Sequence, residues 1–164
     1  MSPAQQASVA IAPAATPAEI EEIHALFLEY AQSLDFNLCF QGFDEELAGL
    51  PGAYAPPGGR LLLARSEDAV IGGVGLRALD ADICEMKRLY VRPGHRALKA
   101  GRALAEALID EARTIGYRAM RLDTLPDMDA AQALYRTLGF RDIPPYYANP
   151  IPGARYCELD LNSI

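Results

Sequence analysis

The strongest constraint on the fold is a strand–helix order that repeats along the second half of the chain. Ile83 to Val91 predicts a β-strand, which ends at Arg92-Pro93-Gly94 because proline cannot continue ladder pairing. Apolar residues at three- and four-residue spacing then predict a helix over Ala100 to Gly116, with the glycine as its C-terminal cap. Arg118 to Thr124 and Asp127 to Gly139 predict a second strand and a second helix. This alternation favours a sheet covered by helices.

The first half of the chain predicts two helices followed by antiparallel strands. Thr16-Pro17-Ala18-Glu19 has the residues of a capping box, and an apolar face behind it extends the helix to Leu34. A short helix is expected at Asp44 to Leu50. Further strands are expected at Ser8 to Pro13, Arg60 to Arg65, Ala69 to Leu76 and Arg155 to Leu161. The middle two precede Ile83 to Val91 in an antiparallel meander, so the expected fold class is mixed α/β.

Length and composition favour one cytoplasmic domain that spans residues 1–164, with residues 1–7 as a mobile tail. The chain has no secretory signal and no apolar run near the ~20 residues that span a bilayer, so neither export nor a membrane location is expected. Without a secretory signal, Cys39, Cys84 and Cys157 favour free thiols over disulfides. No metal site is expected, because neither the cysteines nor the two histidines form a ligand pair.

The charge balance bears on the partners of the protein. Lys plus Arg is 15 and Asp plus Glu is 22, which gives a net charge of −7. Phosphate binding needs a basic surface, so nucleic acid is not an expected partner. An acidic surface favours the attraction of cationic ligands.

The junction after Ile83 to Val91 has the features of an anion site. A helix N-terminus offers unpaired N–H groups and a partial positive charge, and both favour phosphate. Arg96 and Arg102 flank this N-terminus and could donate charge-assisted hydrogen bonds to a pyrophosphate. An ordinary helix start with surface arginines fits the same residues, and this alternative stays open here.

Two motifs resemble those of the GNAT N-acetyltransferase superfamily. Lys87 to Ala112 resembles the acetyl-coenzyme A motif, whose signature Arg/Gln-x-x-Gly-x-Gly/Ala is matched at Arg96 and Gly101. The sequence AQALYRTLGF, which ends at Phe140, resembles the family's A-x-x-L-Y-x-x-x-G-F helix. The resemblance covers Arg60 to Leu161 and implies a mixed, mostly antiparallel sheet of about seven strands flanked by about four helices.

The resemblance also implies an enzyme that uses acetyl-coenzyme A as co-substrate, without a metal. It would transfer the acetyl group directly to a primary amine of a small cationic or polar acceptor. The strand backbone would pair with the pantetheine arm, and a backbone N–H near Leu89 would stabilise the oxyanion. The implied cofactor-binding residues are Leu89, Tyr90, Val91, Arg96, Ala97, Leu98, Lys99, Ala100, Gly101 and Arg102.

Two catalytic residues follow from the resemblance. Tyr135 would protonate the departing thiolate, although an aromatic packed in an apolar helix stripe fits the same position. Glu85 would act as the base or would position a water, with Lys87 and Arg88 as neighbouring cations; a salt-bridged strand glutamate is an equal alternative. Asp123 is a second carboxylate in the same role.

The acceptor site is expected between the loop Asp35 to Phe43 and the segment Pro144 to Pro152, which carries Tyr147. A rigid loop of proline and tyrosine is the alternative for that segment. Amino acids, polyamines, aminoglycoside-like drugs and protein amines all stay open as acceptors, and a homodimer is compatible with the sequence. The expected substrate-binding residues are Phe36, Phe40, Asp123, Tyr146 and Asn149.

The chain departs from the family pattern at three positions. Lys99 and Ala97 stand where glycine is common, and Met128 stands where many relatives carry a cofactor-contacting asparagine. These departures motivate an alternative, a coenzyme A-binding module that regulates or partners another protein without turnover. A Rossmann domain is disfavoured, because no GxGxxG follows the first strand.

Overall fold

A central β-sheet organises the molecule in this computed structural model, which describes residues 8–34, 42–95, 99–126 and 128–162. In this part of the chain the sheet has seven strands in the order β1-β2-β3-β4-β5-β7-β6. Among the described strands only β4 and β5 pair in parallel, so the predicted mixed and mostly antiparallel sheet is confirmed. The strands are β1 (Ala10–Pro13), β2 (Arg60–Ser66), β3 (Ala69–Ala78), β4 (Ile83–Val91), β5 (Ala119–Thr124), β6 (Arg141–Ile143) and β7 (Arg155–Asp160).

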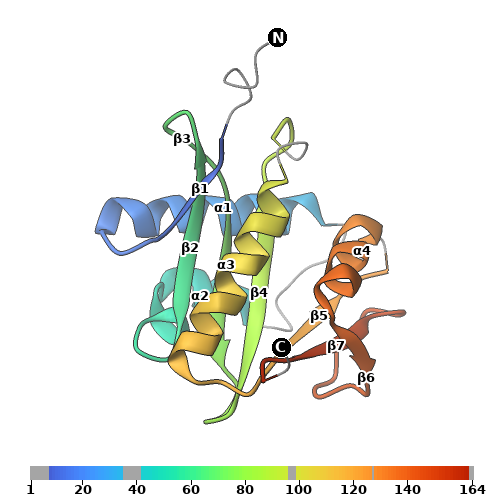
Figure 1. The fold of residues 1–164 in the computed structure, drawn as a ribbon. Helices are drawn as coiled ribbons and strands as arrows, with labels where there is room; N and C mark the ends of the chain where they lie inside the picture. Colours follow the sequence, from blue (N-terminus) through green and yellow to red (C-terminus); the bar gives the residue numbers. More distant parts are fainter. Residues whose placement is uncertain (1–7, 35–41, 96–98, 127, 163–164) are drawn as a thin grey trace.

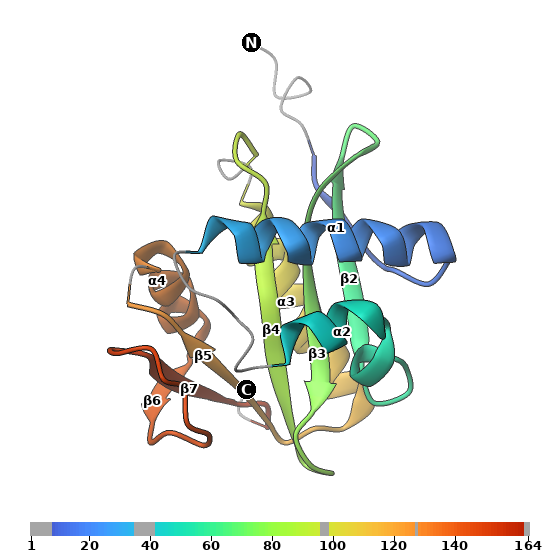
Figure 2. The ribbon, with the colours of Figure 1, turned by 180° about the vertical axis from the view of Figure 1, so that it is seen from behind.

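Helices cover both faces of the sheet. Figure 1 shows α3 in front of the central strands, and Figure 2, from behind, shows α1 crossing the opposite face with α2 beside it. The helix α4 packs on the α3 side, next to β5 and β7 (Figure 1). The helices are α1 (Pro17–Ser33), α2 (Phe43–Ala48), the 3-10 turn η3 (Gly52–Tyr54), α3 (Ala100–Ile115) and α4 (Asp129–Leu138).

The start of α1 and the ends of α3 and α4 form where the sequence predicted them. Thr16 accepts a hydrogen bond from the Glu19 N–H, and the Glu19 carboxylate accepts from the Thr16 N–H, so the capping box is complete. Both α3 and α4 end at a left-handed glycine, Gly116 with φ 109° and Gly139 with φ 102°. These caps depend on local residues, which explains why the sequence alone located them.

The structure differs from the expected elements at several boundaries. The strand β6 was not predicted, because its three residues are too few to display an alternation; it forms by pairing with β7. The helix α4 starts at Asp129 rather than at Asp127, which lies outside the described residues. The predicted tail, residues 1–7, and most of the predicted loop between the first two helices, residues 35–41, also lie outside them.

The core has one layer on each side of the sheet. The larger layer lies under α3 and α4 and includes Leu104, Leu108 and Tyr135, whereas the smaller lies under α1 and includes Ile23 and Phe27. The two layers hold β3 and β4 between them. At the far end of β4 the sheet opens, and the functional site lies there.

Candidate active site

The pocket of interest lies where β4 and β5 separate. Their parallel ladder joins only three residue pairs and stops at Glu85, while β4 continues to Val91. A pocket of about 540 Å³ fills the resulting gap, a volume typical of small-molecule sites. Its lining comes from α1, β4, α3, β5 and α4, and includes Tyr30, Leu34, Lys87, Leu89, Gly101, Asp123, Met128 and Tyr135.

A β-bulge in β4 arranges the side chains along this pocket. The register between β3 and β4 shifts by one residue after Lys87, and Arg88 adopts a left-handed φ of 62°. Met86 and Leu89 therefore both face the α3 layer, although they are three residues apart. Arg88 instead faces α2, where its guanidinium bonds to Glu46 at 3.1 Å. Simple alternation in the sequence did not predict this change of face.

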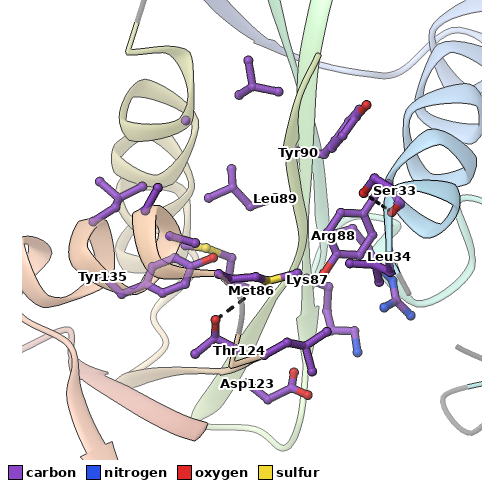
Figure 3. A pocket seen from close by; sticks show the side chains of 18 of the residues that line it. Ser33, Leu34, Met86, Lys87, Arg88, Leu89, Tyr90, Asp123, Thr124 and Tyr135 are labelled. Atoms are coloured by element: carbon purple, nitrogen blue, oxygen red, sulfur yellow. Dashed lines mark hydrogen bonds between the residues drawn. The ribbon is translucent and has the colours of Figure 1, made fainter. Parts of the chain in front are cut away.

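Tyr135 reaches the pocket from α4. Its ring packs edge-on against Phe140 with ring centroids 5.7 Å apart, and its side chain is 8% exposed. Figure 3 shows its hydroxyl directed into the pocket beside Met86. Burial raises the pKa of the Tyr135 hydroxyl, so the phenol holds its proton at neutral pH. Tyr135 is thus packed as an aromatic in the helix stripe and also reaches the pocket with its hydroxyl, while its role as acid stays a prediction.

Glu85 lies beneath the pocket rather than in its wall. Its side chain is 1% exposed and is not part of the pocket lining. Arg77 Nε donates to one carboxylate oxygen at 2.8 Å, and the Tyr146 hydroxyl donates to the other at 2.6 Å. A salt bridge on the strand, one of the two predicted alternatives, is therefore present, and its cation is Arg77 from β3. Arg88 pairs with Glu46.

Glu85 belongs to a row of alternating charges that crosses four strands. Arg77, Glu85, Arg121 and Glu158 are successive register partners on β3, β4, β5 and β7. Arg121 also bonds to Glu158 at 2.7 Å and lies over the ring of Tyr146, 5.4 Å from its centroid. Tyr146 lies in the segment between β6 and β7, and its contacts with Glu85 and Arg121 attach that segment to the sheet.

Asp123 is the carboxylate that lines the pocket. The Tyr147 hydroxyl donates to it, and Asn149 Nδ2 donates to the same oxygen at 3.0 Å. Tyr147 and Tyr156 stack edge-on, with centroids 5.6 Å apart. Among the predicted substrate-binding residues, Asp123 is bonded to Asn149, and Tyr146 packs against Tyr147 with ring centroids 5.6 Å apart, but Asp123 is the one of these that lines the pocket; Phe36 and Phe40 lie outside the described residues.

Lys87 was not predicted as a pocket residue, yet it lines the pocket and is 5% exposed. Figure 3 shows it on the α1 side of β4, near the end of the pocket where Asp123 lies. Burial is the main cause that lowers the pKa of Lys87 to about 8, and the neighbouring Arg88 charge lowers it further. In the sequence, the only hint was that Lys87 lies two residues after Glu85.

Replacing Lys87 by methionine should raise the free energy of unfolding near neutral pH, and the gain should shrink as the pH rises. Between pH 8 and 10.5 the unfolded chain holds a proton that the folded protein has released, so wild-type stability rises with pH. The gap between the two pKa values corresponds to about 3 kcal/mol. Denaturant unfolding of both proteins at about pH 7.5 and about pH 9.5 measures the change.

Lys99→Met provides the control: it is the same substitution at an exposed lysine, so it should not give the pH-dependent gain in stability expected at the buried Lys87. Burial also raises the pKa of Cys84 to about 12 and that of Cys157 to about 11. Both proteins carry these thiols, so their titration cancels in the difference. A Lys87→Met gain of equal size at the two pH values would contradict the expected titration of Lys87.

The start of α3 lies at the other end of the pocket. Lys99 is its N-cap and has a left-handed φ of 59°, a conformation that glycine adopts without strain. Ala100 is fully buried, and Gly101 lines the pocket. Arg102 points toward α4, where it donates to the Thr137 hydroxyl at 3.0 Å. The remaining predicted cofactor-loop residues, Arg96, Ala97 and Leu98, lie outside the described residues.

The other predicted site residues have defined places. Met128 lines the pocket, and its sulfur accepts a contact from the Thr124 hydroxyl at 3.9 Å. Cys84 and Cys157 are free and buried, while Cys39 is outside the described residues.

Within residues 8–34, 42–95, 99–126 and 128–162, no group of three or more acidic, histidine or cysteine side chains could hold a metal. No helix in these ranges is long and apolar enough to cross a bilayer.

Comparison with known proteins agrees with this geometry. The model of the acetyltransferase (GNAT) family matches residues 20–140. An uncharacterized N-acetyltransferase of Schizosaccharomyces pombe is 38% identical over 157 residues, which cover 94% of this chain and 96% of that protein. The family match includes all of the residues that line the pocket, from Tyr30 to Tyr135.

Solved structures share the fold. A GNAT-family acetyltransferase from Staphylococcus aureus superposes with a TM-score of 0.77 at 23% identity, covering 94% of this chain and 99% of its own. A Salmonella typhimurium protein, solved with its cofactor acetyl-CoA, gives a TM-score of 0.73 at 23% identity, covering 96% of each chain. The arrangement of strands and helices is therefore one seen in crystal structures.

Proposed function

This chain belongs to the acetyltransferase (GNAT) family, and we propose that it transfers an acetyl group from acetyl-CoA to a primary amine of a small cationic or polar acceptor. The observation that carries the proposal is the pocket between β4 and β5, which has a protonated phenol on one side and a carboxylate on the other. This arrangement suits direct transfer, because the leaving group must gain a proton while the attacking ammonium must lose one.

Acetyl-CoA fits the end of the pocket formed by β4 and α3. Beyond Glu85, β4 no longer pairs with β5, and its edge faces the pocket. In this proposal the backbone from Leu89 to Val91 pairs there with an extended pantetheine arm. Gly101 keeps the wall at the α3 N-terminus open, since it presents no side chain. The pyrophosphate would meet the residues from Arg96 to Arg102, with the Lys99 N–H among the donors.

Two groups act on the thioester in this proposal. The Leu89 N–H donates to the thioester oxygen and stabilises the negative charge that develops there. Tyr135 donates its proton to the departing thiolate, a role that suits a phenol whose burial keeps it protonated.

The acceptor binds on the α1 side, near Asp123. Tyr147 and Asn149 hold this carboxylate in place, and it faces the pocket, so it can accept a hydrogen bond from an ammonium group. Glu85 is bonded to Arg77 and Tyr146, so a proton would reach it through the Tyr146 hydroxyl. Phe36 and Phe40 remain predictions for the outer part of the acceptor site.

Replacing Asp123 by asparagine should raise the KM for a cationic amine about tenfold or more, because a charge-assisted hydrogen bond contributes about 1.5–3 kcal/mol. The KM for acetyl-CoA should change little, since that substrate binds at the other end of the pocket. Steady-state kinetics with each substrate varied in turn measures both values. Asp142→Asn is the control, because Asp142 is exposed and lies outside this pocket.

Titration calorimetry with acetyl-CoA, followed by a thiol-release assay over a broad panel of amines, tests the proposed function. Micromolar binding together with coenzyme A release in the presence of an amine would support an N-acetyltransferase. Binding without release across the panel would favour a coenzyme A-binding module that acts without turnover. Absence of binding up to millimolar acetyl-CoA would overturn the proposal.

A further inference from the structure

Lysine is rare in this protein, and its two lysines differ sharply in environment. Lys87 and Lys99 are the only lysines among 15 basic Lys and Arg residues. Lys99 is exposed at the start of α3, whereas Lys87 is 5% exposed and lines the pocket. A primary amine is thus built into the cavity that the proposed reaction uses.

Lys87 lies on the acceptor side of that cavity. Figure 3 shows its side chain on the α1 side of β4, directed toward the end of the pocket where Asp123 lies, while Tyr135 enters from the opposite side of β4. The backbone of Leu89, which we place against the thioester oxygen, is only two residues further along β4. Both residues line the pocket, Leu89 from the α3 side of β4 and Lys87 from the α1 side.

The environment of Lys87 favours a reactive, neutral amine. Among the described residues, the charges that act on it include Arg88 and Glu85 on β4, Arg77 on β3 and Asp123 on β5. Burial outweighs the two carboxylates and lowers the pKa of Lys87 to about 8. A substantial fraction of the amine is therefore unprotonated at mildly alkaline pH, the form that attacks a carbonyl carbon.

We propose that Lys87 is an internal acetyl acceptor, which the protein acetylates in its own pocket when no external amine occupies the acceptor end. This inference rests on the proposed function, because acetyl-CoA supplies the group. The Lys87 nitrogen forms a bond to the thioester carbonyl carbon, and the carbon–sulfur bond breaks. The nitrogen loses one proton, the coenzyme A sulfur gains one, and the product is an amide on Lys87 with free coenzyme A.

Acetylation of Lys87 would limit the enzyme's own turnover. An amide carries no charge, so it removes the cost of burying an ammonium group. It also adds volume beside Asp123, at the end where the external amine binds. A protein exposed to acetyl-CoA without acceptor should therefore lose activity toward external amines, and the loss should follow the extent of Lys87 modification.

The test is peptide mass spectrometry of the full-length protein after incubation with acetyl-CoA and no amine. Lys87 should gain one acetyl group, with an occupancy at least about tenfold that of Lys99, because the pocket holds both reactants together. Excess free coenzyme A should slow the reaction. Acetyl phosphate, a chemical donor that needs no binding site, should reverse the preference and modify the exposed Lys99 first.

A second measurement separates failure of this inference from failure of the proposed function. Wild type that releases thiol with an added amine but leaves Lys87 unmodified would overturn the inference alone. Equal or greater modification of Lys99 by acetyl-CoA would also overturn it. Protein that neither binds acetyl-CoA nor releases thiol would remove both proposals. Lys87→Arg should show no time-dependent loss of activity during preincubation with acetyl-CoA, whatever its starting rate.

Discussion

Tyr135→Phe is expected to lower kcat by about 10²–10⁴-fold while leaving the dissociation constant for acetyl-CoA nearly unchanged. The substitution removes only the hydroxyl that faces the pocket, and the ring can keep its edge-on contact with Phe140. Single-turnover kinetics, in which chemistry limits the rate, gives the clearest measurement, together with calorimetry for cofactor affinity.

Tyr117→Phe provides a matched control. Tyr117 is also a buried tyrosine, but its hydroxyl donates to the Gly58 carbonyl at 2.6 Å and it does not line the pocket. This variant should keep its kcat and lose about 1 kcal/mol of stability, the usual contribution of one hydrogen bond. An unchanged single-turnover rate in Tyr135→Phe would remove this residue from the role of acid.

Glu85→Ala is expected to lower the free energy of unfolding by about 3 kcal/mol. The change leaves the partly buried guanidinium of Arg77 and the hydroxyl of Tyr146 without their acceptor, and losing one member of a buried pair costs more than the pair contributes. The melting temperature should fall by about 10 °C for a chain of this size. The KM for the amine should also rise, because Tyr146 no longer anchors the segment that carries Tyr147 and Asn149.

Glu111→Ala is the control, because it removes the glutamate of another arginine–glutamate pair, one whose carboxylate is more exposed than that of Glu85. Glu111 also accepts a hydrogen bond from an arginine, Arg60, at 3.1 Å, but its side chain is 30% exposed, whereas that of Glu85 is 1% exposed. Surface pairs of this kind contribute about 0–1 kcal/mol, so this variant should unfold close to wild type. If Glu85→Ala also stayed within that range, the row of charges across the sheet would not be what holds the segment between β6 and β7.

The sequence by itself determined the elements whose stability is local. The capping box at Thr16 and the glycines Gly116 and Gly139 mark helix ends, because neighbouring residues satisfy the backbone groups there. The resemblance in the motifs around Arg96 and Tyr135 indicated the family before any contact was known. The resemblance also named Asp123, Tyr146 and Asn149 as acceptor-site residues, a role that stays a prediction.

Only the tertiary structure decided how the site is connected. The gap between β4 and β5 and the bulge at Arg88 depend on strand register, which side chains distant in sequence select. The partners of Glu85, Arg77 and Tyr146, come from β3 and from the segment after β6, so no spacing along the chain could identify them. The same long-range packing buries Lys87 in the pocket wall, and burial is what turns an ordinary strand lysine into a candidate nucleophile.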